Sequence, residues 1–165
     1  MRTSNLSIGI INLSVSNILS VYEGCKKAGY NVEVIDKRKS NFKYDIVIVP
    51  GVGSFSSGMK FFNKNNFHEK IKDYLSRPNA LVYGICLGMQ LLFKKSYEFK
   101  ETKGLNLVNG DVKKFKNHKT FITHLGWNKV FLEENEYLKY FKKFEEKNFY
   151  FVHSYFVNPS NKNEI

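Results

Sequence analysis

The chain has 165 residues, which is enough for one domain with a hydrophobic core. Hydrophobic residues make up 42% of the sequence and aromatic residues 16%, and this composition excludes a disordered chain. The formal net charge is +11, but nearly all of the excess is lysine, and arginine occurs only at Arg2, Arg38 and Arg77. Because proteins that read nucleic acids depend on the forked guanidinium of arginine, we expect no nucleic-acid partner.

The sequence also limits the class of site. No apolar stretch is long enough to cross a bilayer, and the first residues lead straight into a predicted strand without the pattern of a signal peptide. The two cysteines, Cys25 and Cys86, are too few for a disulfide framework and are not paired as metal ligands are. We therefore expect a cytoplasmic protein with no membrane contact, no metal and no cofactor.

The first half of the chain alternates between apolar strands and helices. The predicted strands are 6–11, 31–35 and 45–50, and the predicted helices are 18–28 and about 61–77, the second broken at Asn65-Asn66. Ser16 or Asn17 can cap the first helix and Gly29 ends it, and the helical spacing of Cys25 places that residue in the core. This order predicts an α/β fold with a mostly parallel, doubly wound sheet.

A fourth strand, 80–85, ends in Gly84-Ile85-Cys86-Leu87-Gly88, and a helix-period pattern follows immediately. This is the cysteine form of the nucleophile elbow, a sharp strand-to-helix turn at which neighbouring Cβ atoms would be crowded. A helix start beside Cys86 would favour the thiolate, and the backbone N–H of Leu87 would be placed to donate to an oxyanion. The competing interpretation is a small apolar cysteine that closes a buried strand.

A glycine-rich loop, Gly51-Val52-Gly53, follows the third strand. Such a loop at the carboxyl end of a parallel strand can direct backbone N–H groups at an anion or a reacting carbonyl. Most short Gly-x-Gly stretches are simply turns, so the loop alone is a weak signal. Its significance rises because Cys86 is also expected at the carboxyl end of a strand, and these ends share one edge of the sheet.

After the elbow helix, the sequence pattern changes to that of short strands and turns. The segments 104–112 and 119–130 have the pattern of short strands and turns, and we expect them to form a small antiparallel part. A short helix is predicted over 134–144 and an aromatic-rich strand over 148–157.

Four motifs resemble, in the same order, those of the glutaminase subunits of imidazole glycerol phosphate synthase, which are class I (triad) glutamine amidotransferases of histidine biosynthesis. The resemblance spans residues 8–157, so we expect one amidotransferase domain over 1–165. The motifs are Pro50-Gly51-Val52-Gly53, the elbow segment 84–93, His124-Leu125-Gly126-Trp127-Asn128 and Tyr150-Phe151-Val152-His153-Ser154-Tyr155. The elbow alone indicates only the superfamily, and the last two motifs narrow the resemblance to this type of subunit.

The resemblance implies that Cys86 attacks the side-chain amide of glutamine, releasing ammonia and leaving a glutamyl thioester. It implies an oxyanion hole made by the N–H of Leu87 and by the 51–53 loop, which has to reorient before it donates. Further residues are implied by position: Gln90, Glu98, His153, Ser154 and Tyr155 bind glutamine, with Glu98 meeting the α-ammonium, and Asn17, Trp127 and Tyr150 face a (β/α)8-barrel cyclase in a heterodimer. Without the order of the motifs, the sequence would favour core packing for Trp127 and a solvated position at a helix end for Glu98.

One departure from the family affects catalysis. The family completes its triad with a His and a Glu from a His-Pro-Glu stretch near the C-terminus, and no histidine of this sequence is followed two positions later by an acid. The resemblance therefore implies that the chain is C-terminally incomplete and inactive alone, with apolar surface uncovered. Two explanations remain: these residues are part of a longer protein, or they are a copy that has lost catalysis.

Three functions follow. The first is a glutaminase that feeds ammonia to the barrel synthase of histidine biosynthesis. The second is a glutaminase that supplies a surface-sugar amidination pathway, and the third is a non-catalytic subunit that only docks on the barrel through Trp127 and Tyr150.

Overall fold

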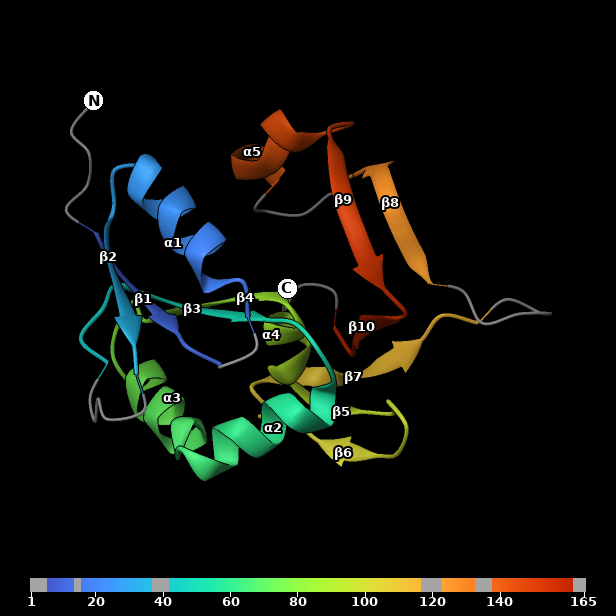
Figure 1. The fold of residues 1–165 in the computed structure, drawn as a ribbon, viewed down its shortest axis with the longest axis horizontal. Helices are drawn as coiled ribbons and strands as arrows, with labels where there is room; N and C mark the ends of the chain where they lie inside the picture. The colour runs from blue at the N-terminus through green and yellow to red at the C-terminus, as the bar shows by residue number, and fades with distance from the viewer. Residues whose placement is uncertain (1–5, 14–15, 37–41, 117–122, 133–137, 162–165) are drawn as a thin grey trace.

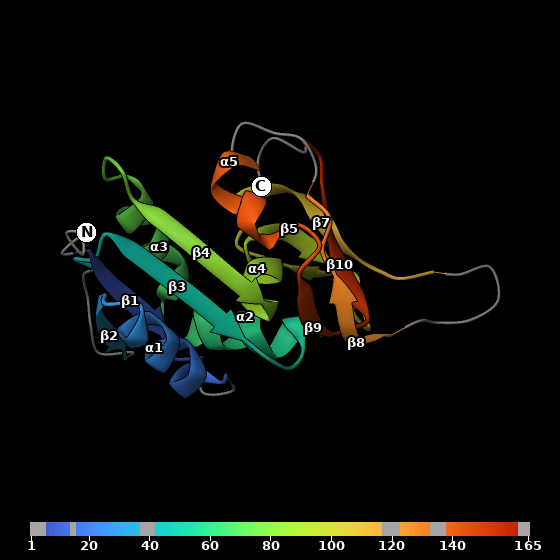
Figure 2. The ribbon, with the colours of Figure 1, turned by 90° about the horizontal axis from the view of Figure 1, so that it is seen from above.

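The computed structural model describes residues 6–13, 16–36, 42–116, 123–132 and 138–161. Four parallel strands form the first sheet, in the order β2-β1-β3-β4 (Figure 2). They are β1 (Ser7–Ile11), β2 (Asn31–Ile35), β3 (Ile46–Gly51) and β4 (Leu81–Cys86). β3 lies inside the sheet and is apolar on both faces, as expected for a parallel strand covered on both sides.

Helices cover both faces of this sheet (Figure 1). Helix α1 (Ile18–Lys27) lies on one face, where Val21 and Tyr22 pack on a cluster that includes Ile8 and Ile48. On the other face lie α2 (Phe55–Lys64), α3 (Phe67–Leu75) and α4 (Leu87–Leu91), which pack on Val47 and Val49. Alternate residues of β3 therefore enter opposite clusters, as period-2 side-chain direction requires, and the predicted doubly wound α/β architecture is confirmed.

The described helix boundaries confirm two predictions and correct one. Asn17 caps α1 by accepting from the backbone N–H of Ser20, and Asn66 breaks the second helical region with a φ of 54°. The prediction that this region begins near residue 61 was wrong, because α2 already begins at Phe55. Ser54 Oγ accepts from the N–H of Ser57. This serine, which the sequence analysis left outside the helix, is therefore the N-cap of α2.

A second, smaller sheet has the order β10-β7-β5-β6 and mixes parallel and antiparallel pairs. Its strands are β5 (Phe93–Ser96), β6 (Thr102–Lys103), β7 (Val108–Lys114) and β10 (Tyr155–Pro159). The sequence analysis did not predict β5, because the segment continues the elbow helix pattern. Helix α4 ends early and the chain enters the second sheet almost at once.

An antiparallel hairpin of β8 (His124–Lys129) and β9 (Asn148–His153) extends from this second part (Figure 1). The prediction of one strand over 148–157 was wrong: β9 pairs with β8, and β10 pairs with β7. Ser154 lies between them. The short helix appears as α5 (Leu138–Phe141) followed by a 3-10 turn (Lys142–Phe144), while residues 119–122 and 134–137 of the predictions lie outside the described ranges.

Two surface features bear on function. β4 is the last strand in the sheet order, and Leu81 and Tyr83 on it are 52% and 53% exposed. Within the described ranges, no helix combines the length and apolarity needed to span a bilayer.

Candidate active site

The turn from β4 into α4 carries Cys86. Its φ is 53°, in the left-handed region that a residue with a Cβ rarely adopts, and its side chain is exposed. A Cβ on Gly84 would overlap the backbone of Met89, and one on Gly88 would overlap the carbonyl oxygen of Val49. The two glycines therefore allow the strand and helix to approach, and the elbow is formed as the sequence predicted. Backbone strain of this kind is typical of functional sites.

The Gly51-Val52-Gly53 loop lies beside this elbow. Gly51 is the register partner of Cys86 in the β3–β4 pair, so the loop and the thiol leave the sheet at the same edge. A Cβ on Gly51 would come within 3.0 Å of the backbone nitrogen of Gly88. Gly53 has a φ of 98°, which glycine tolerates, and half-exposed Val52 points away from the core. The predicted proximity of the loop and Cys86 is confirmed.

A pocket of about 510 Å³ opens at this edge and is large enough for an amino acid. Its lining joins the elbow, the glycine loop and the second sheet: Val52, Gly53, Cys86, Leu87, Gln90, Glu98, Phe99, Lys114, Thr123, Val152, His153, Ser154 and Tyr155. All the predicted glutamine-binding residues are among them. The alternative in which Cys86 is a sealed core cysteine is wrong.

Glu98 lies on the pocket wall and also holds the glycine loop. Its Oε2 accepts from the backbone N–H of Phe55, the first residue of α2, at 2.5 Å. A carboxylate at that position satisfies an unpaired donor and is stabilised by the positive end of the helix dipole. Phe55 follows Gly53 by two residues. The Glu98 carboxylate therefore places a negative charge in the pocket and also anchors the end of the loop.

Gln90 and His153 meet at one acceptor. The carbonyl oxygen of Tyr155 lies 3.2 Å from Gln90 Nε2 and 2.8 Å from His153 Nδ1. Gln90 comes from the elbow helix, whereas His153 and Tyr155 flank the break between β9 and β10. This shared acceptor connects the second sheet to α4, the helix that follows Cys86.

Sequence reasoning missed four lining residues, Phe99, Lys114, Thr123 and Val152. Thr123 and Val152 neighbour His124 and His153, so their place in a motif could have identified them. Lys114 is the register partner of Tyr155 in the β7–β10 pair, and only the strand pairing reveals it. Lys114 and Glu98 give the pocket one cationic and one anionic side chain.

Comparisons with known proteins agree with this geometry. The sequence model of the family described as "Glutamine amidotransferase class-I" matches residues 10–165. The chain belongs to this family. Amidotransferases with solved structures share its fold: one titled "Crystal structure of glutamine amidotransferase" superposes with a TM-score of 0.67 at 13% identity, covering 94% of this chain and 75% of that one. The structure of PurLQS from Thermotoga maritima gives 0.65 at 16% identity, covering 96% and 71%.

Curated amidotransferase relatives are more similar in sequence. The protein named "Imidazole glycerol phosphate synthase subunit HisH" from Thermotoga maritima is 34% identical, covering 91% of this chain and 71% of its own length. The protein of that name from Caldanaerobacter subterraneus is 37% identical, covering 94% and 75%. The Cyanophora paradoxa protein, named as subunit hisH, is also 37% identical, covering 99% and 76%.

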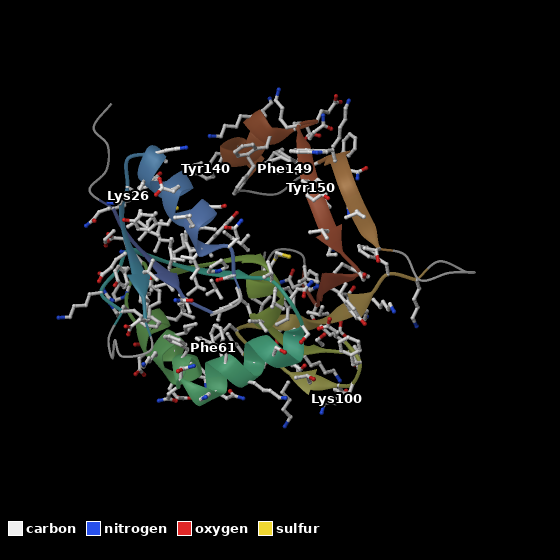
Figure 3. The ribbon with its side chains drawn as sticks, in the orientation of Figure 1. Lys26, Phe61, Lys100, Tyr140, Phe149 and Tyr150 are labelled. Atoms are coloured by element: carbon white, nitrogen blue, oxygen red, sulfur yellow. The ribbon has the colours of Figure 1, made fainter. Side chains whose placement is uncertain are left out.

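In this amidotransferase chain, the residues expected to face a partner lie on exposed surface. Trp127 and Tyr150 are register partners on the hairpin, 71% and 56% exposed, with ring centroids 5.6 Å apart (Tyr150 is labelled in Figure 3). Their exposure makes the core interpretation of Trp127 wrong. Asn17 is exposed at the start of α1, where it caps the helix.

No histidine in the described ranges is hydrogen-bonded to Cys86. His68 lies on α3, and His124 and His153 lie on the hairpin, where both are engaged in hydrogen bonds. Among the residues that the structure describes, none hydrogen-bonds to Cys86 Sγ. The remaining histidine, His118, lies outside the described ranges.

Proposed function

We propose that this chain is the glutaminase part of an imidazole glycerol phosphate synthase, and that Cys86 is its nucleophile. The observation that carries the proposal is the position of Cys86: an exposed thiol at a positive-φ corner that opens into a pocket with Glu98, Gln90 and the 51–53 loop. The names of the relatives from three organisms support the assignment to that synthase.

In the proposed reaction, the thiolate of Cys86 attacks the side-chain amide carbon of glutamine. The carbonyl oxygen becomes an oxyanion, which the N–H groups of Leu87 and of the Gly51-Val52-Gly53 loop would stabilise. The C–N bond then breaks, the amide nitrogen takes up a proton and leaves as ammonia, and a glutamyl thioester remains on Cys86. Attack by water on the thioester releases glutamate and restores the thiol.

The two charged lining residues suit the other end of the substrate. Glu98 would meet the α-ammonium of glutamine, while its second contact, to the N–H of Phe55, keeps its position fixed. His153, Ser154 and Tyr155 would shape the wall beside it. Binding at Glu98 would thus act next to the loop that has to donate to the oxyanion.

The partner in this proposal is a barrel-type cyclase subunit that receives the ammonia in a heterodimer. The support is the face of the hairpin that carries Leu125, Trp127, Tyr150 and Val152, all exposed. Exposed aromatic residues at this density are typical of protein interfaces. Asn17 would contribute at the start of α1.

A second candidate is a subunit that docks on the barrel without hydrolysing glutamine. It is favoured by the absence of any side chain hydrogen-bonded to Cys86 Sγ in the described part of the chain, because proton transfer then lacks an aligned group. On either candidate, the 165-residue chain alone should show no steady-state glutamine turnover.

Labelling with an electrophilic glutamine analogue, such as the chloroketone, tests the proposal. We expect covalent modification of Cys86, detected by peptide mass mapping, and protection by free glutamine. Glu98→Gln keeps an acceptor for the Phe55 N–H but removes the charge, so it should slow labelling strongly while lowering the melting temperature only slightly. No labelling of Cys86, or labelling that glutamine does not slow, would remove glutamine as the substrate.

A further inference from the structure

A chain of hydrogen bonds runs along the face of the hairpin that carries His124 and His153, and it ends at the pocket. Its direction follows from one atom, the carbonyl oxygen of Tyr155, which can only accept. His153 Nδ1 lies 2.8 Å from this oxygen, so that nitrogen must carry the proton. In the neutral imidazole the other nitrogen, His153 Nε2, is therefore an acceptor.

The same logic fixes the next two members. His124 Nδ1 lies 3.1 Å from His153 Nε2 and must donate to it, which leaves His124 Nε2 as an acceptor. Asn128 Nδ2 lies 3.0 Å from His124 Nε2 and supplies that donor. Each ring nitrogen of His124 and His153 thus has a partner while both imidazoles are neutral, and only one arrangement of protons achieves this.

Aromatic rings hold the two imidazoles in place. Phe151 stacks on the ring of His124, with centroids 4.4 Å apart, and Phe115 packs against His153 at 5.2 Å. Partial burial among rings raises the cost of an unpaired nitrogen, because water cannot replace the lost partner freely. The cluster therefore favours the complete series over any partial one.

The far end of the series reaches the elbow helix. The Tyr155 carbonyl that accepts from His153 also accepts from Gln90 Nε2, and His153, Tyr155 and Gln90 all line the pocket with Cys86. Neither His124 nor Asn128 lines the pocket. The hydrogen-bonded series connects them to the pocket through His153.

We propose that His124 and Asn128 are positioning residues for the pocket. They hold His153 in the tautomer protonated on Nδ1, which fixes the Tyr155 carbonyl and, through it, the side chain of Gln90. This inference rests on the proposed function only where it concerns glutamine; the proton arrangement itself does not depend on the substrate.

The arrangement can be measured by NMR on the 165-residue chain labelled with ¹⁵N-histidine, at about pH 8, where an ordinary histidine is neutral. Imidazole nitrogen shifts identify which nitrogen carries the proton. We expect both His124 and His153 to be protonated on Nδ1, whereas a free neutral imidazole prefers the other nitrogen. Protonation of His153 on Nε2 would overturn the proposal.

Two variants interrupt the series. His124→Phe removes the donor to His153 but keeps a ring against Phe151, and Asn128→Ala removes the last donor from an exposed position where folding is not at risk. In each, the histidine that loses its donor should show a mixture of tautomers, and in His124→Phe the side-chain amide signals of Gln90 should also shift. Unchanged shifts in both variants would contradict the proposal. Leu125→Ala is the control, because this exposed side chain lies on the opposite face of β8 from His124 and carries no hydrogen-bonding atom.

The functional consequence is measured as a ratio of rates for Cys86: labelling by the chloroketone glutamine analogue over labelling by iodoacetamide. Loss of one ordered hydrogen bond should lower this ratio about five- to tenfold in His124→Phe. A changed tautomer with an unchanged ratio would show that the series does not reach the pocket, and would refute the positioning role. If the analogue labels no form of the protein, the glutamine proposal fails, while the tautomer data still decide the proton arrangement.

Discussion

Gly51 and Cys86 lie opposite each other at the ends of the parallel strands β3 and β4. This pairing places the glycine loop and the thiol at one edge of the sheet, although 35 positions separate them in the sequence. Close approach of α4 to β3 maintains it, because Gly88 lies directly against the carbonyl of Val49. The elbow is thus as much a packing feature of the sheet as a local turn.

Gly88→Ala should therefore destabilise the fold. Its Cβ would overlap backbone, which cannot move aside as a side chain can, and overpacking of this kind costs about 1–3 kcal/mol or more. Chemical denaturation gives the free energy of unfolding. The control is Gly24→Ala on α1, where no heavy atom lies within 4 Å of the added Cβ and a gain of up to about 1 kcal/mol is expected. Equal effects of the two substitutions would contradict this account.

The two cysteines should differ in reactivity. Burial raises the pKa of the Cys25 thiol above its ordinary value, whereas Cys86 is exposed at the pocket. Because the thiolate is the reacting form, iodoacetamide at neutral pH should modify Cys86 first. Mass mapping of partly alkylated protein measures the order, and Cys86→Ser should remove the fast phase. A fast phase that survives in Cys86→Ser would assign it to Cys25.

Acid stability should depend on Asp45. The backbone N–H and the hydroxyl of Ser7 both donate to Asp45 Oδ2 at 2.7 Å, and they hold the pKa of this carboxyl below its ordinary value of 3.8. A folded-state pKa below that of the unfolded chain stabilises the fold above the unfolded value, and the contribution is lost as pH falls through the folded value.

Asp45→Asn should therefore flatten the decline of unfolding free energy below about pH 4, measured by urea denaturation at several pH values. Ser7→Ala removes one of the two donors and should give an intermediate slope. If the variant and the parent protein decline in parallel, Asp45 is not the group responsible.

Trp127→Ala should separate binding from folding. The side chain is largely exposed, so its removal should change the free energy of unfolding by less than about 0.5 kcal/mol. Affinity for the proposed barrel subunit should fall tenfold or more, since exposed tryptophans at interfaces often contribute about 2 kcal/mol or more to binding. Calorimetry measures the affinity and thermal melting the stability.

Leu75→Ala, on α3 at the opposite end of the molecule (Figures 1 and 2), is the matched control and should leave the affinity unchanged. A loss of stability in Trp127→Ala as large as the loss of affinity would return Trp127 to a structural role.

The sequence was most informative where one backbone conformation needs particular residues. The glycines around Cys86 and the apolar strands predicted the sheet, the elbow and its loop, and motif order identified the pocket residues Gln90, Glu98 and His153. It was least informative where a capping or breaking signal is weak. Ser54 resembled loop until its hydroxyl was seen to cap α2, and Ser154 divides two strands without any glycine or proline.

Pairings between distant strands were also beyond reach. The contacts of Lys114 with the pocket and of His124 with His153 depend on register in β7–β10 and β8–β9, and aromatic strands fit several registers equally well. Strand β5 could not be predicted either. Its four residues continue the helical sequence pattern, but helix α4 ends after five residues. Tertiary packing decided these elements.

The exposure of Leu81 and Tyr83 on β4 has a practical consequence for anyone handling this chain. A strand at the border of a sheet with exposed apolar side chains is a template for further strand addition. Sedimentation at increasing protein concentration should therefore be the first measurement on purified material, before kinetics are attempted. Lysine or proline placed at position 83 would be the direct remedy for self-association.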